Sequence, residues 1–196
     1  MSQEVEIKFL VESVRALHAK LRAAGFRLAT ERTHEMNTLY DDEAQSLRAR
    51  GELLRVRKYG PRWILTHKSK GAAGRHKART ETETQVADGE KMQGILLALG
   101  LRPSFRYEKF RSEWTDGKGH VVVDETPIGN VSEIEGPPRW IDATARRLGV
   151  AREQYITDTY AQMFANWKLK TGSTATEMTF KAVKGGRGKL ERVFSG

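Results

Sequence analysis

The sequence predicts an α+β fold in which an eight-stranded antiparallel sheet closes into a barrel, or tunnel, with helices around it. Eight short segments alternate polar residues with apolar or β-branched ones at a period of two, which is typical of strands. Helical patterns are few by comparison, and paired charges at spacing two recur from one segment to the next. Eight antiparallel strands can close around a small ligand.

The expected strands lie at 4–9, 35–41, 54–57, 63–68, 80–84, 105–114, 120–124 and 131–135. The break at Tyr59-Gly60-Pro61-Arg62 suits a hairpin turn. Residues 69–77 form a basic connection that contains glycines. It is not a Walker-type phosphate loop, because no GK[ST] pattern and no helix start follow it.

Four helices are expected. Ser13 is suited to cap a helix that ends at Gly25, and Asp88 is suited to cap a second that ends at Gly100. Two more are predicted at about 140–148 and 153–168. We divide the chain into a tunnel domain at 1–170 and a basic, flexible tail at 171–196, which carries five Lys and Arg against two Glu. We expect a chain that lacks this tail to keep its catalysis.

The composition describes a single globular domain of 196 residues with a net charge of +9. Excess positive charge attracts polyanions but does not choose among nucleic acid, a nucleotide and polyphosphate. No cysteine is present, which excludes disulfides and thiolate metal sites. The histidines show no H-x-x-x-H spacing, so a zinc site is not expected. We see no membrane-length apolar run and no secretory leader, so a cytoplasmic location is expected.

Charged side chains gather on one face of several predicted strands. In the first strand Glu4, Glu6 and Lys8 alternate with apolar residues, which is the ordinary pattern of a half-buried strand in water. The pattern recurs, however, in the pairs Arg55/Arg57, Glu81/Glu83, Lys109/Arg111 and Glu133/Glu135, and Lys68 and Asp124 join the same face. We therefore expect these faces to line one shared, wet cavity. The acidic run at 41–43 is interpreted as a turn in preference to a metal site.

Such a cavity would hold cations and carboxylates together. Salt bridges among them are one explanation, since burying unpaired charges costs several kcal/mol per ion. The functional explanation uses both groups: Arg and Lys suit a chain of phosphates, and carboxylates without cysteine suit Mg²⁺ or Mn²⁺. A metal that bridges a polyphosphate held by Arg and Lys is a recurring arrangement in phosphoryl and nucleotidyl transfer.

The ordered set of motifs resembles a known family. Glu4-Val5-Glu6-Ile7-Lys8 is similar to the E-x-E-x-K signature of the CYTH superfamily, the triphosphate tunnel metalloenzymes. The resemblance covers about residues 2–168 and continues in order through 54–57, 66–68, 79–81, 109–111, Asp124 and 133–135. One such motif is weakly specific, whereas the whole ordered set is strongly specific.

The resemblance implies roles for individual residues. It implies that triphosphate is bound by the basic residues Lys8, Arg55, Arg57, Lys68, Arg79, Lys109 and Arg111, of which Lys8, Lys109 and Arg111 would be catalytic. It implies that one or two Mg²⁺ or Mn²⁺ ions are held by Glu4, Glu6, Asp124, Glu133 and Glu135, with Glu81 and Glu83 as additional candidates.

The family contains class IV adenylyl cyclases, thiamine triphosphatases and inorganic triphosphatases, and the sequence is most similar to the cyclase branch. Conversion of ATP to cyclic AMP and pyrophosphate is therefore the first expectation, with triphosphate hydrolysis as the alternative. A noncatalytic binder of polyphosphate or RNA is a third, less favoured hypothesis, because the carboxylates would repel a phosphate backbone and no RNA-binding signature is present.

Overall fold

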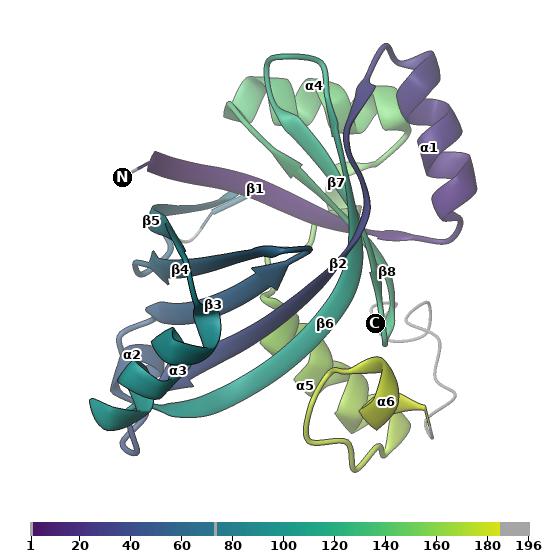
Figure 1. Cartoon of the computed structure of the whole chain (residues 1–196). Helices are drawn as coiled ribbons and strands as arrows, with labels where there is room; N and C mark the ends of the chain where they lie inside the picture. The colour runs from purple at the N-terminus through teal and green to yellow at the C-terminus, as the bar shows by residue number, and fades with distance from the viewer. Residues whose placement is uncertain (1, 73, 185–196) are drawn as a thin grey trace.

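The computed structural model describes residues 2–72 and 74–184. Within them the eight predicted strands form one closed antiparallel barrel, in the order β1-β5-β4-β3-β2-β6-β7-β8, with β8 returning to β1 (Figure 1). The strands are β1 (Ser2–Val11), β2 (Arg27–Asp41), β3 (Leu53–Tyr59), β4 (Arg62–Lys68), β5 (Lys77–Val86), β6 (Arg102–Thr115), β7 (His120–Thr126) and β8 (Gly129–Glu135). The predicted fold class is confirmed.

Helices lie outside this barrel (Figure 1). They are α1 (Val14–Ala23), α2 (Ser46–Ala49), α3 (Gly89–Ala98), α4 (Pro138–Leu148), α5 (Tyr160–Thr171) and α6 (Phe180–Val183). Ser13 and Asp88 cap α1 and α3 as predicted, since each side chain accepts a hydrogen bond from a backbone N–H in the first turn. In the described residues no helix is long and apolar enough to cross a membrane; the cytoplasmic location stays a prediction.

The apolar core lies between the barrel and its helices, so the barrel is apolar outside and charged inside. On β1 the outward residues Ile7 and Phe9 are buried with Leu21 of α1 and Ile141 of α4. Each such side chain contributes about 1.5–3 kcal/mol when fully buried. This outer core supports the fold and leaves the inward faces of the strands available for polar side chains.

Two predicted boundaries differ most from the structure. β2 begins at residue 27 rather than 35, because its first part is largely exposed and pairs irregularly with β6, so it lacks the alternation that marks a strand. The last predicted helix does not begin at 153. Arg152–Gln154 form a short 3₁₀ turn and Ile156 then pairs with the backbone of Lys8. The helix begins only at the capping box in which Thr159 and Gln162 bond each other's backbone N–H.

The acidic run at 41–43 is structural. The Asp41 carboxylate accepts hydrogen bonds from the backbone N–H groups of Asp42, Leu47 and Arg48 at 2.9–3.0 Å. These bonds fix the turn between β2 and α2, which agrees with the interpretation favoured from the sequence.

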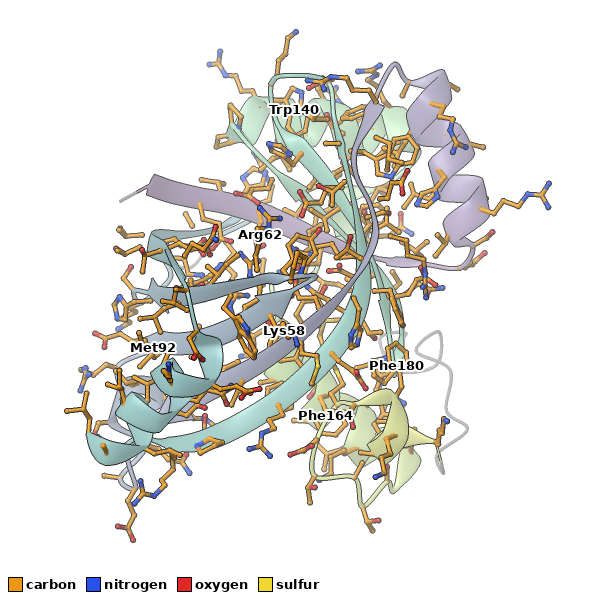
Figure 2. The ribbon with its side chains drawn as sticks, in the orientation of Figure 1. Lys58, Arg62, Met92, Trp140, Phe164 and Phe180 are labelled. Atoms are coloured by element: carbon orange, nitrogen blue, oxygen red, sulfur yellow. The ribbon has the colours of Figure 1, made fainter. Side chains whose placement is uncertain are left out.

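The C-terminal segment differs most from its prediction. β7 pairs with β6 only over Phe110–Thr115 of β6. Beside the earlier part of β6, the backbone of Met178 donates to Arg106 O (3.0 Å) and accepts from Glu108 N–H (3.1 Å). The Met178 side chain is 0% exposed and packs with α5, and Figure 2 shows Phe164 and Phe180 on this side of β6.

Residues 172–184 are therefore part of the packed structure rather than a loose tail, and 185–196 lie outside the described residues. Removing everything after residue 170 would take Met178 and Val183 out of the apolar core. The expectation that such a truncation leaves catalysis intact is one that the structure argues against.

Candidate active site

The inward faces of the strands enclose one cavity of about 1410 Å³. Because side chains alternate at a period of two along each strand, the charged residues selected from the sequence point into the same space. The cavity is lined by all seven predicted cations, Lys8, Arg55, Arg57, Lys68, Arg79, Lys109 and Arg111, and by the predicted carboxylates Glu4, Glu6, Glu81, Glu83, Glu133 and Glu135.

Aromatic, basic and acidic residues line this cavity in order along β6. On β6 the lining residues are first the aromatic Phe105 and Tyr107, then the basic Lys109 and Arg111, and then the acidic Glu113. We call Phe105 and Tyr107 the aromatic zone. The basic zone comprises the lining cations Lys8, Arg55, Arg57, Lys68, Lys77, Arg79, Lys109 and Arg111, and the acidic zone comprises the lining carboxylates Glu4, Glu6, Glu81, Glu83, Glu113, Glu133 and Glu135.

Basic and acidic residues also follow one another along β5 and β1, which pair with each other. β5 presents Lys77 and Arg79 before Glu81 and Glu83, and β1, which runs the opposite way, presents Glu4 and Glu6 before Lys8. The antiparallel register sets Glu6 beside Lys77. Glu4 lies likewise beside Arg79, so acidic and basic side chains alternate across the pair β1 and β5.

In the basic zone, Lys109 and Arg111 are held in place by Asp124 of β7. Lys109 Nζ lies 2.9 Å from Asp124 Oδ2, and Arg111 donates from Nε and Nη2 to the two carboxylate oxygens at 2.7 Å each. The Tyr160 hydroxyl of α5 donates to the same carboxylate at 2.5 Å. Burial and the Asp124 charge keep the pKa of Tyr160 well above its ordinary value, so the hydroxyl remains a donor.

Asp124 is the one predicted metal ligand that does not line the cavity. Its side chain is 0% exposed and is absent from the lining of the cavity, and its oxygens are taken up by Lys109, Arg111 and Tyr160. Asp124 is therefore a positioning residue for the two cations, and its role as a metal ligand stays a prediction.

Glu35 on β2 performs a similar task and was not selected from the sequence. It is fully buried, accepts from the amide of Asn37 at 2.9 Å, and lies 3.5–3.8 Å from Lys109, Arg57 and Arg111. Burial by itself would raise the pKa of Glu35, but these cations outweigh it and hold the pKa below its ordinary value. The alternation within the predicted strand at 35–41 could have identified both Glu35 and Asn37.

Tyr107, Tyr160 and Lys77 also line the cavity without having been selected. The sequence placed Tyr107 on the same strand face as Lys109, and that signal could have been used. Tyr160 comes from a helix, and no pattern in the sequence connects it to the strands. Burial and the nearby charges of Lys8 and Arg79 lower the pKa of Lys77 to about 8.

Two buried donors in the basic zone have no partner. In the described part of the chain, Arg55 Nε and Arg57 Nε make no hydrogen bond. A buried polar group without a partner is costly, and guanidinium donors match the oxygens of phosphate groups. The Nε donors of these two arginines are thus available to an acceptor, and phosphate binding by them stays a prediction.

The acidic zone contains more negative charge than its cations neutralise. Lys68 and Arg79 contact Glu4 at 2.7 and 3.1 Å, and Lys8 contacts Glu6 at 2.5 Å. The backbone of Glu135 pairs with β1 and β7, but its side chain makes no hydrogen bond or ion pair among the described residues. Burial and the charges of Glu4, Glu133 and Glu6 raise the pKa of Glu135 to about 7.

A hard divalent cation would relieve this repulsion, and the oxygen donors suit Mg²⁺ or Mn²⁺. Across residues 2–72 and 74–184, no three carboxylate or imidazole side chains already stand in positions to coordinate an ion. Mg²⁺ does not require a complete set of protein ligands, because it commonly binds through one or two carboxylates, waters and the phosphates of a substrate. The donor set of Glu4, Glu6, Glu133 and Glu135 therefore fits a metal.

Comparisons with known proteins show what the chain is similar to. The CYTH domain family matches residues 2–160. The chain is 30% identical to adenylate cyclase CyaB of Aeromonas hydrophila over 168 residues, which cover 80% of this chain and 86% of that one.

Solved structures share the fold. A putative adenylate cyclase from Vibrio parahaemolyticus superposes with a TM-score of 0.75 at 19% identity, covering 83% of this chain and 97% of that one. A putative adenylyl cyclase from Hippeastrum, described as revealing a dominant triphosphatase activity, superposes with a TM-score of 0.62 at 18% identity, covering 83% and 95%.

Proposed function

Because this chain belongs to the CYTH domain family, we propose that it is a divalent-metal-dependent enzyme that acts on the triphosphate group of a nucleotide or related substrate, with adenylyl cyclase activity as the first candidate. The observation that carries the proposal is the convergence of seven predicted cations from five strands in one cavity, next to an acidic zone. A polyphosphate would neutralise the cations, and a metal ion would neutralise the acidic zone.

The basic zone would bind the phosphates and stabilise charge as it moves between their oxygens. Lys8, Lys109 and Arg111 are candidates for the catalytic contacts, because transfer from a triphosphate depends mainly on positioning and electrostatic stabilisation. Arg55 and Arg57 would use their free Nε donors on phosphate oxygens. Asp124 fixes Lys109 and Arg111 before substrate arrives. Glu35 lies near the same two cations and near Arg57. Little reorganisation of these side chains is therefore needed when substrate binds.

Glu4, Glu6, Glu133 and Glu135 would hold Mg²⁺ or Mn²⁺. When bound, such an ion supplies positive charge to the phosphate oxygens. Arg111 and Lys8 also contact Glu133, at 2.6 and 3.4 Å, so this residue connects the basic zone with the acidic zone. Glu133 therefore has a positioning role in addition to any contact with a metal.

Two reactions are compatible with this site. A cyclase directs the ribose 3′-hydroxyl at the α-phosphorus and releases pyrophosphate, whereas a hydrolase directs water at the terminal phosphorus. The relative from Aeromonas hydrophila, which is named a cyclase, favours the first reaction. The description of the Hippeastrum protein favours triphosphate hydrolysis as the second candidate.

A noncatalytic role in binding long polyanions is less favoured. The cations of the site are mostly buried on the inside of the barrel, and Lys109 is almost wholly enclosed. A nucleic-acid backbone binds cations on an outer surface or groove that it can follow. The enclosed cations suit a short phosphate chain instead.

A product assay tests the proposal. Purified protein is incubated with ATP, thiamine triphosphate or inorganic triphosphate in the presence of Mg²⁺ or Mn²⁺. We expect cyclic AMP and pyrophosphate from ATP; orthophosphate would assign the protein to the hydrolases. Arg57→Gln should abolish turnover, while Arg62→Gln, on the exposed start of β4, serves as the matched control. Absence of any product from all three substrates would refute the proposal.

A further inference from the structure

Lys77, the first residue of β5, differs from the other lysines of the basic zone. Lys8, Lys68 and Lys109 each donate a hydrogen bond to a carboxylate oxygen at 2.5–2.9 Å. Lys77 Nζ makes no hydrogen bond to a described residue, and its one ion pair among them is with Glu6 Oε1 at 3.9 Å. The donors of this ammonium group are therefore available to a ligand in the cavity.

Lys77 also lies at the point where β1 changes its neighbour. The pairing of β1 with β5 ends at Glu6, opposite Lys77. Two residues further along β1, Lys8 N–H donates to Ile156 O at 2.9 Å and Lys8 O accepts from Ile156 N–H at 2.8 Å. The ladder between β1 and β5 thus continues on only one side of Lys77 along the chain, and a contact beyond the ladder is needed to fix this end of the strand.

Asp142 of α4 provides that contact. Its Oδ1 lies 2.9 Å from His76 Nε2, and its Oδ2 accepts from Arg75 Nη2 at 2.8 Å. The side chains of His76 and Asp142 are only 10% and 13% exposed. The Tyr155 hydroxyl reaches Asp142 Oδ1 at the longer distance of 3.4 Å. Because α4 packs against β1 and β8 on the outside of the barrel (Figure 1), Asp142 ties the start of β5 to its neighbouring strands.

The alternation of the strand connects this outer contact with an inner charge. Successive side chains point to opposite faces, and the structure places His76 against Asp142 outside the barrel and Lys77 on the lining of the cavity. A bond that fixes the His76 ring therefore also fixes the backbone from which the Lys77 side chain enters the cavity. Without that bond, the end of β5 would be free to separate from β1 and to carry the ammonium group away from Glu6.

We propose that Lys77 is a further phosphate-binding residue and that Asp142, acting through His76, is its positioning residue. The ammonium group would donate to a phosphate oxygen beside Glu6. The inference rests on the proposed function, because a phosphate chain must enter the cavity. A lysine that only neutralised Glu6 would add nothing to the affinity for phosphate, and the two roles are therefore separable by experiment.

The test measures the binding of inorganic triphosphate with Mg²⁺ by calorimetry. The variants are Lys77→Gln, Asp142→Ala and the double variant that combines them. His76→Ala removes the bond to Asp142 from its other end. Asp116→Ala is the matched control: Asp116 accepts from Trp140 Nε1 at 3.0 Å, so it also ties α4 to the barrel, but it lies in the turn between β6 and β7 and does not line the cavity. Thermal unfolding verifies that each variant is folded.

We expect Lys77→Gln, Asp142→Ala and His76→Ala each to weaken triphosphate binding by about tenfold, by analogy with the loss of groups that orient the ligands of a metal. The double variant should bind about as weakly as Lys77→Gln alone, because changes that act through one residue are not additive. Asp116→Ala should bind like the wild type.

Normal binding by Lys77→Gln would overturn the role of Lys77 and, with it, that of Asp142. Losses that multiply in the double variant would overturn the positioning role, as would equal weakening by Asp116→Ala, which would indicate a general effect of α4 packing. These outcomes leave the proposed function intact. If the wild-type protein binds no triphosphate, the proposed function fails and the inference with it.

Discussion

Asp124 and Glu135 lie on neighbouring strands of the same barrel, yet they are in opposite electrostatic situations. Asp124 accepts hydrogen bonds from Lys109, Arg111 and Tyr160 and is closed off from the cavity. Glu135 lines the cavity, and burial together with neighbouring carboxylates raises its pKa to about 7. The comparison shows that two carboxylates of one barrel differ in their surroundings, since cations surround Asp124 and other carboxylates surround Glu135.

The largest effect is expected from Asp124→Asn. This change removes the buried carboxylate that lies nearest to Lys109 and bonds Arg111 through two donors, although Glu35 and Glu133 remain near these cations. Breaking a buried ion pair typically costs about 3–5 kcal/mol. We expect the free energy of unfolding to fall by that amount in urea titrations, and turnover to be lost. Glu125→Gln is the control, since this neighbouring carboxylate pairs with Arg32 outside the cavity and should change stability by less than about 1 kcal/mol. Wild-type stability of Asp124→Asn would contradict its structural role.

Glu135→Gln should change the metal dependence of activity without lowering the stability, in contrast to Asp124→Asn. We expect the metal concentration for half-maximal activity to rise by roughly 10- to 100-fold, by analogy with the loss of groups that support metal sites. The free energy of unfolding without metal should not fall, because the change removes a carboxylate repelled by Glu4, Glu133 and Glu6. A less stable variant with normal metal dependence would show that Glu135 belongs with Asp124.

The pH dependence of stability sharpens the same contrast. The pKa of Glu135 is raised to about 7 in the folded protein, against about 4.3 for an unfolded chain. Between these values the folded state binds more protons, so this group lowers the stability as pH rises from about 4 to 7. We expect Glu135→Gln to remove that component in metal-free denaturant titrations at a series of pH values. Parallel curves for variant and wild type would count against the raised pKa.

The contribution of Glu35 to the pH dependence of stability has the opposite sign. The pKa of its carboxyl is held below the ordinary value by Lys109, Arg111 and Arg57 despite burial. Its contribution to stability is therefore present above an unfolded pKa of about 4.3 and is lost as pH falls through the folded pKa. We expect Glu35→Gln to be destabilised at pH 7 and to approach the wild type in denaturant titrations below pH 4. A constant difference across this range would contradict the assignment.

The smallest effect is expected from Tyr160→Phe. The ring remains, and only the hydrogen bond to Asp124 is lost, which should cost about 1 kcal/mol. The Michaelis constant for triphosphate should rise modestly while the fold persists, because Asp124 keeps its bonds to Lys109 and Arg111. Tyr155→Phe is the control, since the Tyr155 hydroxyl bonds Asp142 away from the cavity. A full loss of activity in Tyr160→Phe would indicate direct contact with substrate.

Much of the site could be predicted from the sequence because strands impose a period of two. Once Glu4, Glu6 and Lys8 were assigned to one strand face, the same rule placed the charged pairs of four other strands on the inside of a barrel. Glu35 and Asn37 obeyed this rule and were missed only because their strand carried no repeated charge pair. The prediction that these side chains converge in one cavity is confirmed.

The sequence by itself determined the closed barrel, its charged interior and the family, because these follow from local alternation repeated along the chain. The tertiary structure decided which charges neutralise one another. It buried Asp124 under Lys109, Arg111 and Tyr160, left Glu135 among other carboxylates, and folded residues 172–184 against β6. Those outcomes depend on distances between segments remote in sequence, and alternation within a strand specifies the face of a side chain but not its partner.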